Sequence, residues 1–316
     1  MLPSVLQRST TDHVPVLADE VRRLVAVQPE DTVVDATFGA GGHAALLAED
    51  LQGRGRYIAI DRDPDVRPYF EAFKRSHRSL QTRLLRGEFS LVLEQLATND
   101  VQADAVLIDL GVSSMQIDRP ERGFSYAHDA PLDMRMDPSA DVSARTLVNE
   151  LPERELAHIF RRYGEERYAK QIARAIVRRR PLERTGELVD VIRSAIPAPA
   201  RFGEGHPARR VFQGLRIAVN DELGALERAL PAALAMLRPG GRLAVISFHS
   251  LEDRIVKNFL RDAEHGCTCP PDFPVCVCGN EPELRAVSRK PIRPSADEVA
   301  RNPRAASARL RGGVKV

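Results

Sequence analysis

The sequence lacks the features that mark secreted and membrane-spanning proteins. No apolar run approaches the roughly 18 residues of a membrane span. The first eight residues lack the basic start and long apolar stretch of a signal peptide. All four cysteines fall between Cys267 and Cys278, so no disulfide framework extends over the chain. We therefore expect a cytoplasmic protein with no membrane segment.

Strong net charge is also missing, but the charge is unevenly distributed. The 316 residues carry a formal net charge of only +2. Residues 154–216 hold 15 Lys and Arg against 7 Asp and Glu, and residues 285–316 hold 9 against 2. Such asymmetry points weakly to a nucleic-acid partner, and solvated helix faces explain it equally well. The length suits two domains, or one domain with a large insertion.

The first two-fifths of the chain alternate between strand and helix patterns. Short apolar runs separated by helical periodicity predict a parallel sheet that is covered on both faces. The predicted strands are 32–38, 56–60, 81–85 and 103–110, and the predicted helices are 43–48 and 66–76.

This alternation is interrupted and then resumes. Residues 120–138 read as an ordered loop, and 153–196 have helical periodicity, which predicts an inserted helical domain. A helix over 223–237 follows, in which Pro231 causes a kink or starts a second helix. We then predict a turn at 238–241, a strand at 242–248, a helix from about Leu251, an extended segment at 291–303 and an edge strand at 307–311.

A glycine cluster follows the first predicted strand, in the segment Asp35–His43. Glycines at this place let the backbone turn tightly and approach a ligand. The spacing of Gly39, Gly41 and Ala44 matches a dinucleotide-binding loop, whereas an acid before the glycines resembles the loop of class I methyltransferases. A nicotinamide-dependent oxidoreductase, a methyltransferase and a glycine turn without a ligand all remain open at this point.

Two further residues lie where a nucleoside would bind. Asp61 ends the second predicted strand, where a carboxylate can accept hydrogen bonds from two ribose hydroxyls of either cofactor. Phe89 follows the third strand and is a candidate to pack on an adenine, although a core aromatic fits the sequence as well.

The strongest single segment is 107–116, a strand that ends in Asp109 and continues into a loop of small residues. In a doubly wound sheet the carboxyl ends of the central strands form the ligand site. An amino-group methyltransferase needs a hydrogen-bond acceptor there, because the amino lone pair of cytosine is delocalised into the ring. Positioning and electrostatics then provide most of the rate.

Taken together, these motifs resemble the RsmH (MraW) family from about Asp12 to Arg311. The matching segments are HVPVL at 13–17, DATFGAGGH at 35–43, DLGVSS at 109–114, ERGFS at 121–125, PLDMRMD at 131–137, YGEER at 163–167, FQGLRI at 212–217, VNDEL at 219–223, SFHSLEDR at 247–254, PIRPS at 291–295 and NPR at 302–304.

The resemblance implies a bacterial S-adenosylmethionine-dependent methyltransferase that modifies N4 of a cytidine in the decoding region of 16S ribosomal RNA. Its substrate is either naked RNA or the assembled small ribosomal subunit. It implies a class I methyltransferase sheet at 1–122 and 222–316, split by a helical RNA-binding insertion at 123–221. Asp109 is the catalytic candidate. The implied cofactor contacts are Gly41, Gly42, His43, Asp61, Phe89, Asp109 and Gln116. A non-catalytic RNA-binding protein is the remaining alternative.

Two features depart from the expected pattern. No aromatic residue follows Asp109 to stack on the target base, so Phe124, Tyr126, Phe248 and His249 are the candidates for stacking. In addition, Cys267, Cys269, Cys276 and Cys278 form two Cys-x-Cys pairs. Their spacing suits one structural zinc ion, with disulfides or reduced thiols as alternatives. The sequence gives no indication of the oligomeric state.

Overall fold

The chain divides into two compact units. The computed structural model describes residues 15–201, 206–267, 269, 275 and 278–316. The first unit contains the chain up to Asp61, then Asp65–Leu110, and then everything from Leu230 onward. The second contains Arg62–Pro64 and Gly111–Ala229. The insertion was predicted at 123–221, so the observed unit starts earlier, ends later and includes three residues from the first half of the chain.

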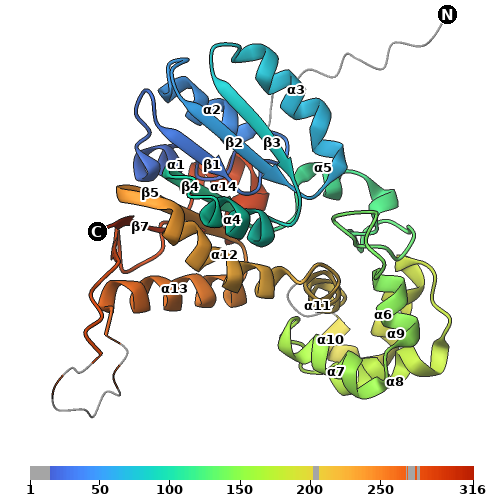
Figure 1. Ribbon diagram of the computed structural model, residues 1–316. Helices are drawn as coiled ribbons and strands as arrows, with labels where there is room; N and C mark the ends of the chain where they lie inside the picture. The colour runs from blue at the N-terminus through green and yellow to red at the C-terminus, as the bar shows by residue number, and fades with distance from the viewer. Residues whose placement is uncertain (1–14, 202–205, 268, 270–274, 276–277) are drawn as a thin grey trace, which may run out of the picture. The chain divides into compact units, whose positions relative to one another are not determined.

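A seven-stranded sheet forms the centre of the first unit (Figure 1). Its order is β3-β2-β1-β4-β5-β7-β6. Strands β3 to β5 are mutually parallel, whereas β7 is antiparallel to both of its neighbours. This is the strand order of class I methyltransferases, the fold class that was predicted from the sequence. The strands are β1 Thr32–Asp35, β2 Arg56–Asp61, β3 Gln81–Arg86, β4 Ala103–Asp109, β5 Leu237–Ser247, β6 Leu284–Ala286 and β7 Arg309–Lys315.

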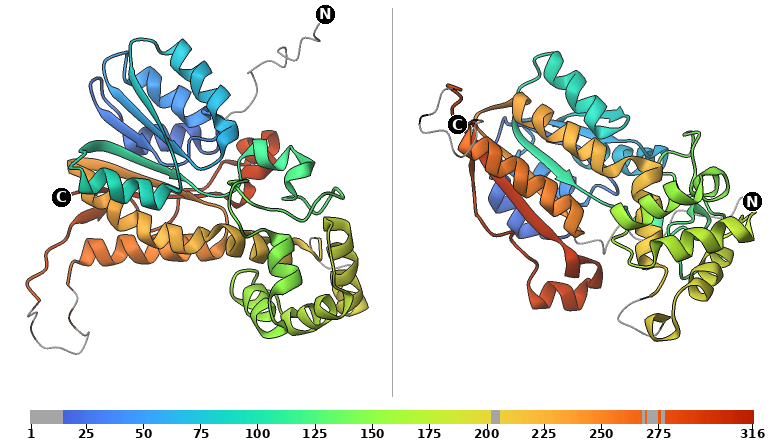
Figure 2. Two further views of the ribbon diagram at one scale, coloured as in Figure 1. Left: turned by 45° about the vertical axis from the view of Figure 1, so that its right-hand side comes forward. Right: turned by 90° about the horizontal axis from the view of Figure 1, so that it is seen from below.

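Helices cover both faces of this sheet, with α1, α2 and α3 on one side and α4, α13 and the end of α12, Glu222–Met236, on the other (Figures 1 and 2). Because the central strands are buried on both faces, their interior residues are largely apolar. Val33, Val34 and Ile108 are fully buried. The helices are α1 Ala18–Val25, α2 Gly42–Asp50, α3 Arg67–Ser76, α4 Phe89–Thr98, α13 Ser250–His265 and α14 Ala296–Arg301, with short 3-10 turns at Pro64–Val66 and Pro303–Ser307.

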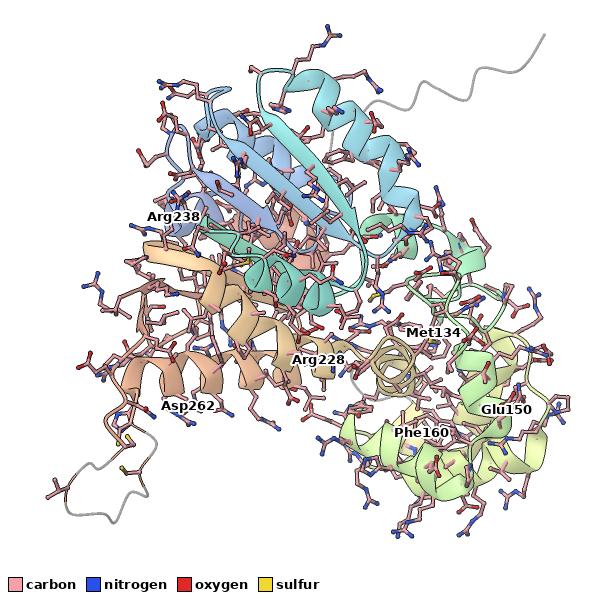
Figure 3. All side chains as sticks on the ribbon, viewed as in Figure 1. Met134, Glu150, Phe160, Arg228, Arg238 and Asp262 are labelled. Atoms are coloured by element: carbon pink, nitrogen blue, oxygen red, sulfur yellow. The ribbon has the colours of Figure 1, made fainter. Side chains whose placement is uncertain are left out.

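The second unit is helical, and its amphipathic helices pack around a core of their own. Phe160 of α7 and Ile172 and Ile176 of α8 are fully buried in that core, as is Met134 of the preceding loop (Figure 3). The elements are α5 Ser114–Ile117, a 3-10 turn at Pro120–Arg122, α6 Ala144–Glu150, α7 Glu153–Arg162, α8 Ala169–Arg179, α9 Thr185–Ala195, α10 Ala198–Arg201 and α11 Arg209–Asn220. Helix α12, Glu222–Met236, starts in this unit and ends in the first.

Several predictions about the second half of the chain were wrong. Residues 291–303 are not simply extended, because the Ser295 hydroxyl caps the short helix α14 by accepting a hydrogen bond from the Glu298 amide. The last strand is not at the edge, since β7 lies between β5 and β6. The predicted turn at 238–241 is an irregular start of β5. Pro231 lies inside helix Glu222–Met236 and does not start a second helix, whereas the alternative of a kink stays a prediction. Across the described residues, no helix is long and apolar enough to cross a membrane.

Candidate active site

Three carboxyl groups lie at the carboxyl ends of adjacent parallel strands in the first unit. Asp35 ends β1, Asp61 ends β2 and Asp109 ends β4. The register places Asp35 beside Ala59 of β2 and beside Leu107 of β4. Asp61 and Asp109 therefore each extend two residues beyond Asp35 at the same edge. This edge is where open α/β sheets bind their ligands.

The glycine loop after β1 covers these strand ends and is fixed to both neighbouring strands. The Phe38 amide donates to the Ile60 carbonyl over 3.0 Å, and the Gly39 amide donates to Asp61 Oδ2 over 2.8 Å. On the other side, the Asp109 amide donates to the Thr37 hydroxyl over 2.6 Å. Gly41 has a φ of +80° and a Cβ there would lie 2.9 Å from the Phe38 ring, so this position requires glycine.

Burial and nearby negative charges disfavour the ionised forms of Asp35 and Asp109. Burial raises the pKa of Asp35 to about 6, although hydrogen bonds from the Tyr57 hydroxyl and the Thr37 amide oppose the rise. The pKa of Asp109 is raised to about 8, first by burial and then by the negative charges of Asp35 and Glu252. The Asp109 side chain nevertheless keeps 28% of its surface exposed, so it can be reached by a ligand.

His43, on the first turn of α2, completes this polar cluster. Its Nε2 lies 3.6 Å from Asp109 Oδ2, and burial lowers the pKa of His43 to about 4, so the ring is neutral at physiological pH. Among the described residues, neither ring nitrogen of His43 nor Oδ1 of Asp109 has a hydrogen-bond partner, although all three atoms are buried. Buried polar atoms without partners are costly and are expected where a ligand binds.

A cationic ligand suits this edge better than an anionic one. A positive charge beside Asp109 would offset the repulsion that raises the pKa of its carboxyl. The diphosphate of a nicotinamide cofactor would instead add negative charge next to three acids. The site therefore fits the sulfonium of S-adenosylmethionine, and Asp61 remains the predicted acceptor for the ribose hydroxyls.

The remaining predicted contacts lie in different places. Gly42 is the first residue of α2, and Phe89 is the half-buried first residue of α4, just beyond β3. Gln116 belongs to the second unit, where its amide nitrogen donates to Asp63 over 2.9 Å and its oxygen accepts from the Ser113 amide over 3.0 Å. All seven contacts remain predictions.

Sequence reasoning missed two residues that shape the electrostatics of this edge. Tyr57 is fully buried, and its hydroxyl donates to Asp35 Oδ2 over 2.8 Å. Glu252, buried in the first turn of α13, accepts hydrogen bonds from the Phe248 and His249 amides. The SFHSLEDR segment could have indicated Glu252, because an acid three residues after the helix cap, here His249, is a capping-box pattern.

The four aromatic candidates for base stacking have different surroundings. The Tyr126 ring stacks on His206 with centroids 4.4 Å apart and packs edge-on against Phe212. His249 caps α13 through its own ring nitrogen. Phe124 packs against the core of the second unit. Phe248 directly follows β5 and is half-buried at the same sheet edge as Asp109, whose partner in the register is Ile246.

The strand order and this acidic edge define a class I methyltransferase. A family model described as the MraW methylase family matches residues 10–315. A protein named "Ribosomal RNA small subunit methyltransferase H" from Heliobacterium modesticaldum is 55% identical over 96% of this chain and 98% of its own length. One of the same name from Symbiobacterium thermophilum is 52% identical over 96% of both chains. The chain belongs to the MraW methylase family.

Similarity to solved structures is more distant. An rRNA methylase from Streptococcus thermophilus aligns over 95% of this chain and 93% of its own, with a TM-score of 0.41 and 12% identity. As a class I member of a methylase family, the protein uses S-adenosylmethionine as its methyl donor.

Proposed function

We propose that the protein methylates the N4 amino group of a cytidine in the decoding region of 16S ribosomal RNA, in the cytoplasm and within the small ribosomal subunit. Family membership and the printed names of the relatives support the ribosomal RNA substrate. The acidic edge supports the choice of an amino group, because methylation of an amine requires an acceptor for its protons.

The observation that carries this proposal is the state of Asp109. Its carboxyl group lies at the end of β4, keeps part of its surface exposed and has a pKa raised to about 8. A carboxyl with a pKa near the working pH can accept a proton from a reacting group and release it afterwards. An acid with an ordinary pKa would be a much weaker proton acceptor.

The residues around Asp109 define a division of roles. S-adenosylmethionine, when bound, supplies an electrophilic methyl group on a positively charged sulfur. Asp109 accepts a hydrogen bond from the amino group, which aims its lone pair and provides a place for the departing proton. The neutral His43 ring, 3.6 Å away, limits the positions that the Asp109 carboxyl can take, and it does not compete for that proton because its own pKa is low. Asp61 orients the ribose.

The second unit is proposed to hold the RNA. Arg178 and Arg179 at the end of α8 are exposed and fit phosphate contacts. Two other arginines of the basic segments have internal roles instead. The Arg180 guanidinium donates to the carbonyls of Val148 and Leu151, and Arg216 forms a two-pronged ion pair with Glu222.

The test is a methyl-transfer assay on small subunits and on naked 16S RNA from cells that lack this protein. Mass mapping should place one new methyl group on the amino group of a single cytidine. A matched RNA with uridine at that position has no amino group and should accept no methyl. A methyl group on a ring carbon, a ribose or another base would contradict the proposal.

A further inference from the structure

The described residues at the two ends of the loop between α13 and β6 meet at a place that is called the neck below. The Glu283 amide donates to the Ala263 carbonyl over 2.9 Å, which joins the two ends of the loop. Gly266 ends α13 with a φ of +67°, and a Cβ there would lie only 2.4 Å from the backbone of Glu281. The two chain segments at the neck, around Gly266 and Glu281, are therefore in close backbone contact. Cys267 lies directly at this neck, four residues beyond Ala263, and its amide donates to the His265 carbonyl over 2.8 Å. Asp262, in the last turn before the neck, is labelled in Figure 3.

Three cysteine sulfurs converge at this place. The Sγ atoms of Cys267, Cys269 and Cys278 all lie within 4.8 Å of one another. Those of Cys267 and Cys278 are 3.8 Å apart, far longer than the roughly 2.05 Å of a disulfide bond. A zinc ion with Zn–S bonds of about 2.3 Å at the centre of a tetrahedron requires its sulfurs to be about 3.8 Å apart. The observed separation therefore matches one edge of a zinc–thiolate tetrahedron.

We propose that the loop binds one structural zinc ion through the thiolates of Cys267, Cys269 and Cys278. Cys276 lies outside the described residues. Its sequence spacing to Cys278 repeats that of Cys267 to Cys269. Each thiol releases its proton when it binds the metal, so binding is stronger at higher pH.

The surroundings of the cluster explain why the loop would need a metal. Val275, within the loop, has 68% of its surface exposed. The described residues between His265 and Leu284 include no helix or strand, so hydrogen bonds of regular structure do not order them. A zinc ion at the neck would cross-link the loop where its two ends meet and fix the start of β6, which pairs with β7.

The first test is the metal content of the full-length protein, produced with zinc in the medium and purified without chelator. Elemental analysis should find about one zinc per chain, as a single site requires. Cys267→Ser and Cys278→Ser should lose the metal, and Val275→Ala, a change in the same loop, should keep it. Clearly substoichiometric zinc in the wild-type protein would overturn the proposal, whether its cysteines are reduced or joined in disulfides.

A second measurement does not depend on any variant folding. Cobalt exchanged into the wild-type protein should show thiolate-to-metal charge transfer and the strong visible bands of tetrahedral coordination. A thiol-modifying reagent should release the metal in step with the loss of thiols, as followed by a metal-sensitive dye. Cobalt bands typical of octahedral oxygen ligation would show that the metal is not bound by the cysteines and would also refute the site.

Discussion

Replacing Asp109 by asparagine should stabilise the protein while it impairs methyl transfer. In the folded chain Asp109 keeps its proton up to a pKa of about 8, whereas the unfolded chain ionises near the ordinary value of 3.8. Between these two values the folded state binds more protons, so the contribution of Asp109 to stability is lost as the pH rises through this window. Asparagine cannot ionise, so it avoids this loss.

The size of the effect follows from the shift in pKa. At about 1.4 kcal/mol per pKa unit, the shift corresponds to roughly 6 kcal/mol once the carboxyl is fully ionised. Because 28% of the side chain is exposed and solvent screens part of that cost, we expect Asp109→Asn to gain about 2–3 kcal/mol near pH 9. The gain should shrink steadily toward pH 5.

Urea unfolding of both proteins, followed by circular dichroism at several pH values, measures this difference. Asp262→Asn, the same chemical change at an exposed position of α13, is the control and should show little effect at any pH. A difference that is independent of pH, or an Asn variant that is less stable above pH 7, would refute the electrostatic reasoning.

The same reasoning predicts proton release when S-adenosylmethionine binds. A positive charge beside Asp109 lowers the pKa of its carboxyl, so cofactor binding at pH 7 should release up to one proton. Calorimetry in two buffers with different ionisation enthalpies measures this release. Asp109→Asn should release less, and its single-turnover rate of methyl transfer should fall severely. Wild-type rates in the variant would leave Asp109 without a role in the reaction.

Three further changes test the site and the RNA surface. Asp61→Ala should weaken cofactor binding by about 2–4 kcal/mol, because two ribose hydroxyls lose a charged acceptor. The cofactor affinity of Asp61→Asn, whose side chain can still accept from Gly39, should lie between those of the wild type and Asp61→Ala. Calorimetry that shows unchanged affinity in both variants would exclude the ribose role. Replacing Arg178 and Arg179 with alanine should flatten the salt dependence of RNA binding by about 0.7–0.9 log units per lost phosphate contact without altering cofactor affinity. The paired control is Lys74 and Arg75 to alanine on α3, and equal slopes in both variants would remove Arg178 and Arg179 from the interface. Phe248→Ala should raise KM for RNA and leave cofactor affinity unchanged if the ring stacks on the target base, whereas an unchanged KM would eliminate Phe248.

The parallel half of the sheet could be predicted because burial leaves a direct mark on its sequence. Strands β1, β2 and β4 have largely apolar, buried interiors and end in acids, which located both the strands and the candidate site. The prediction for the first strand ran three residues too far, because the backbone from Ala36 already forms the loop over the strand ends.

Features that depend on distant partners could not be predicted in this way. The pKa of Asp109 is raised first by burial and then by the negative charges of Asp35 and Glu252, which only the fold brings close to it. Helix α14 was missed because prolines at 291, 294 and 303 surround a segment of only six residues. Strand β6 has three residues, too few for any alternation to be recognised.

The interior position of β7 has a consequence for how the first unit is completed. During synthesis, β5 is made well before β7, so one of its edges lacks a strand until Arg309–Lys315 becomes available. In the sheet β6 pairs with β7, so β6 cannot join the sheet before β7 has been synthesised. An unpaired strand edge is prone to associate with other chains. Nascent or C-terminally truncated chains should therefore be the aggregation-prone forms of this protein, even though the residues of the acidic edge are already present in them.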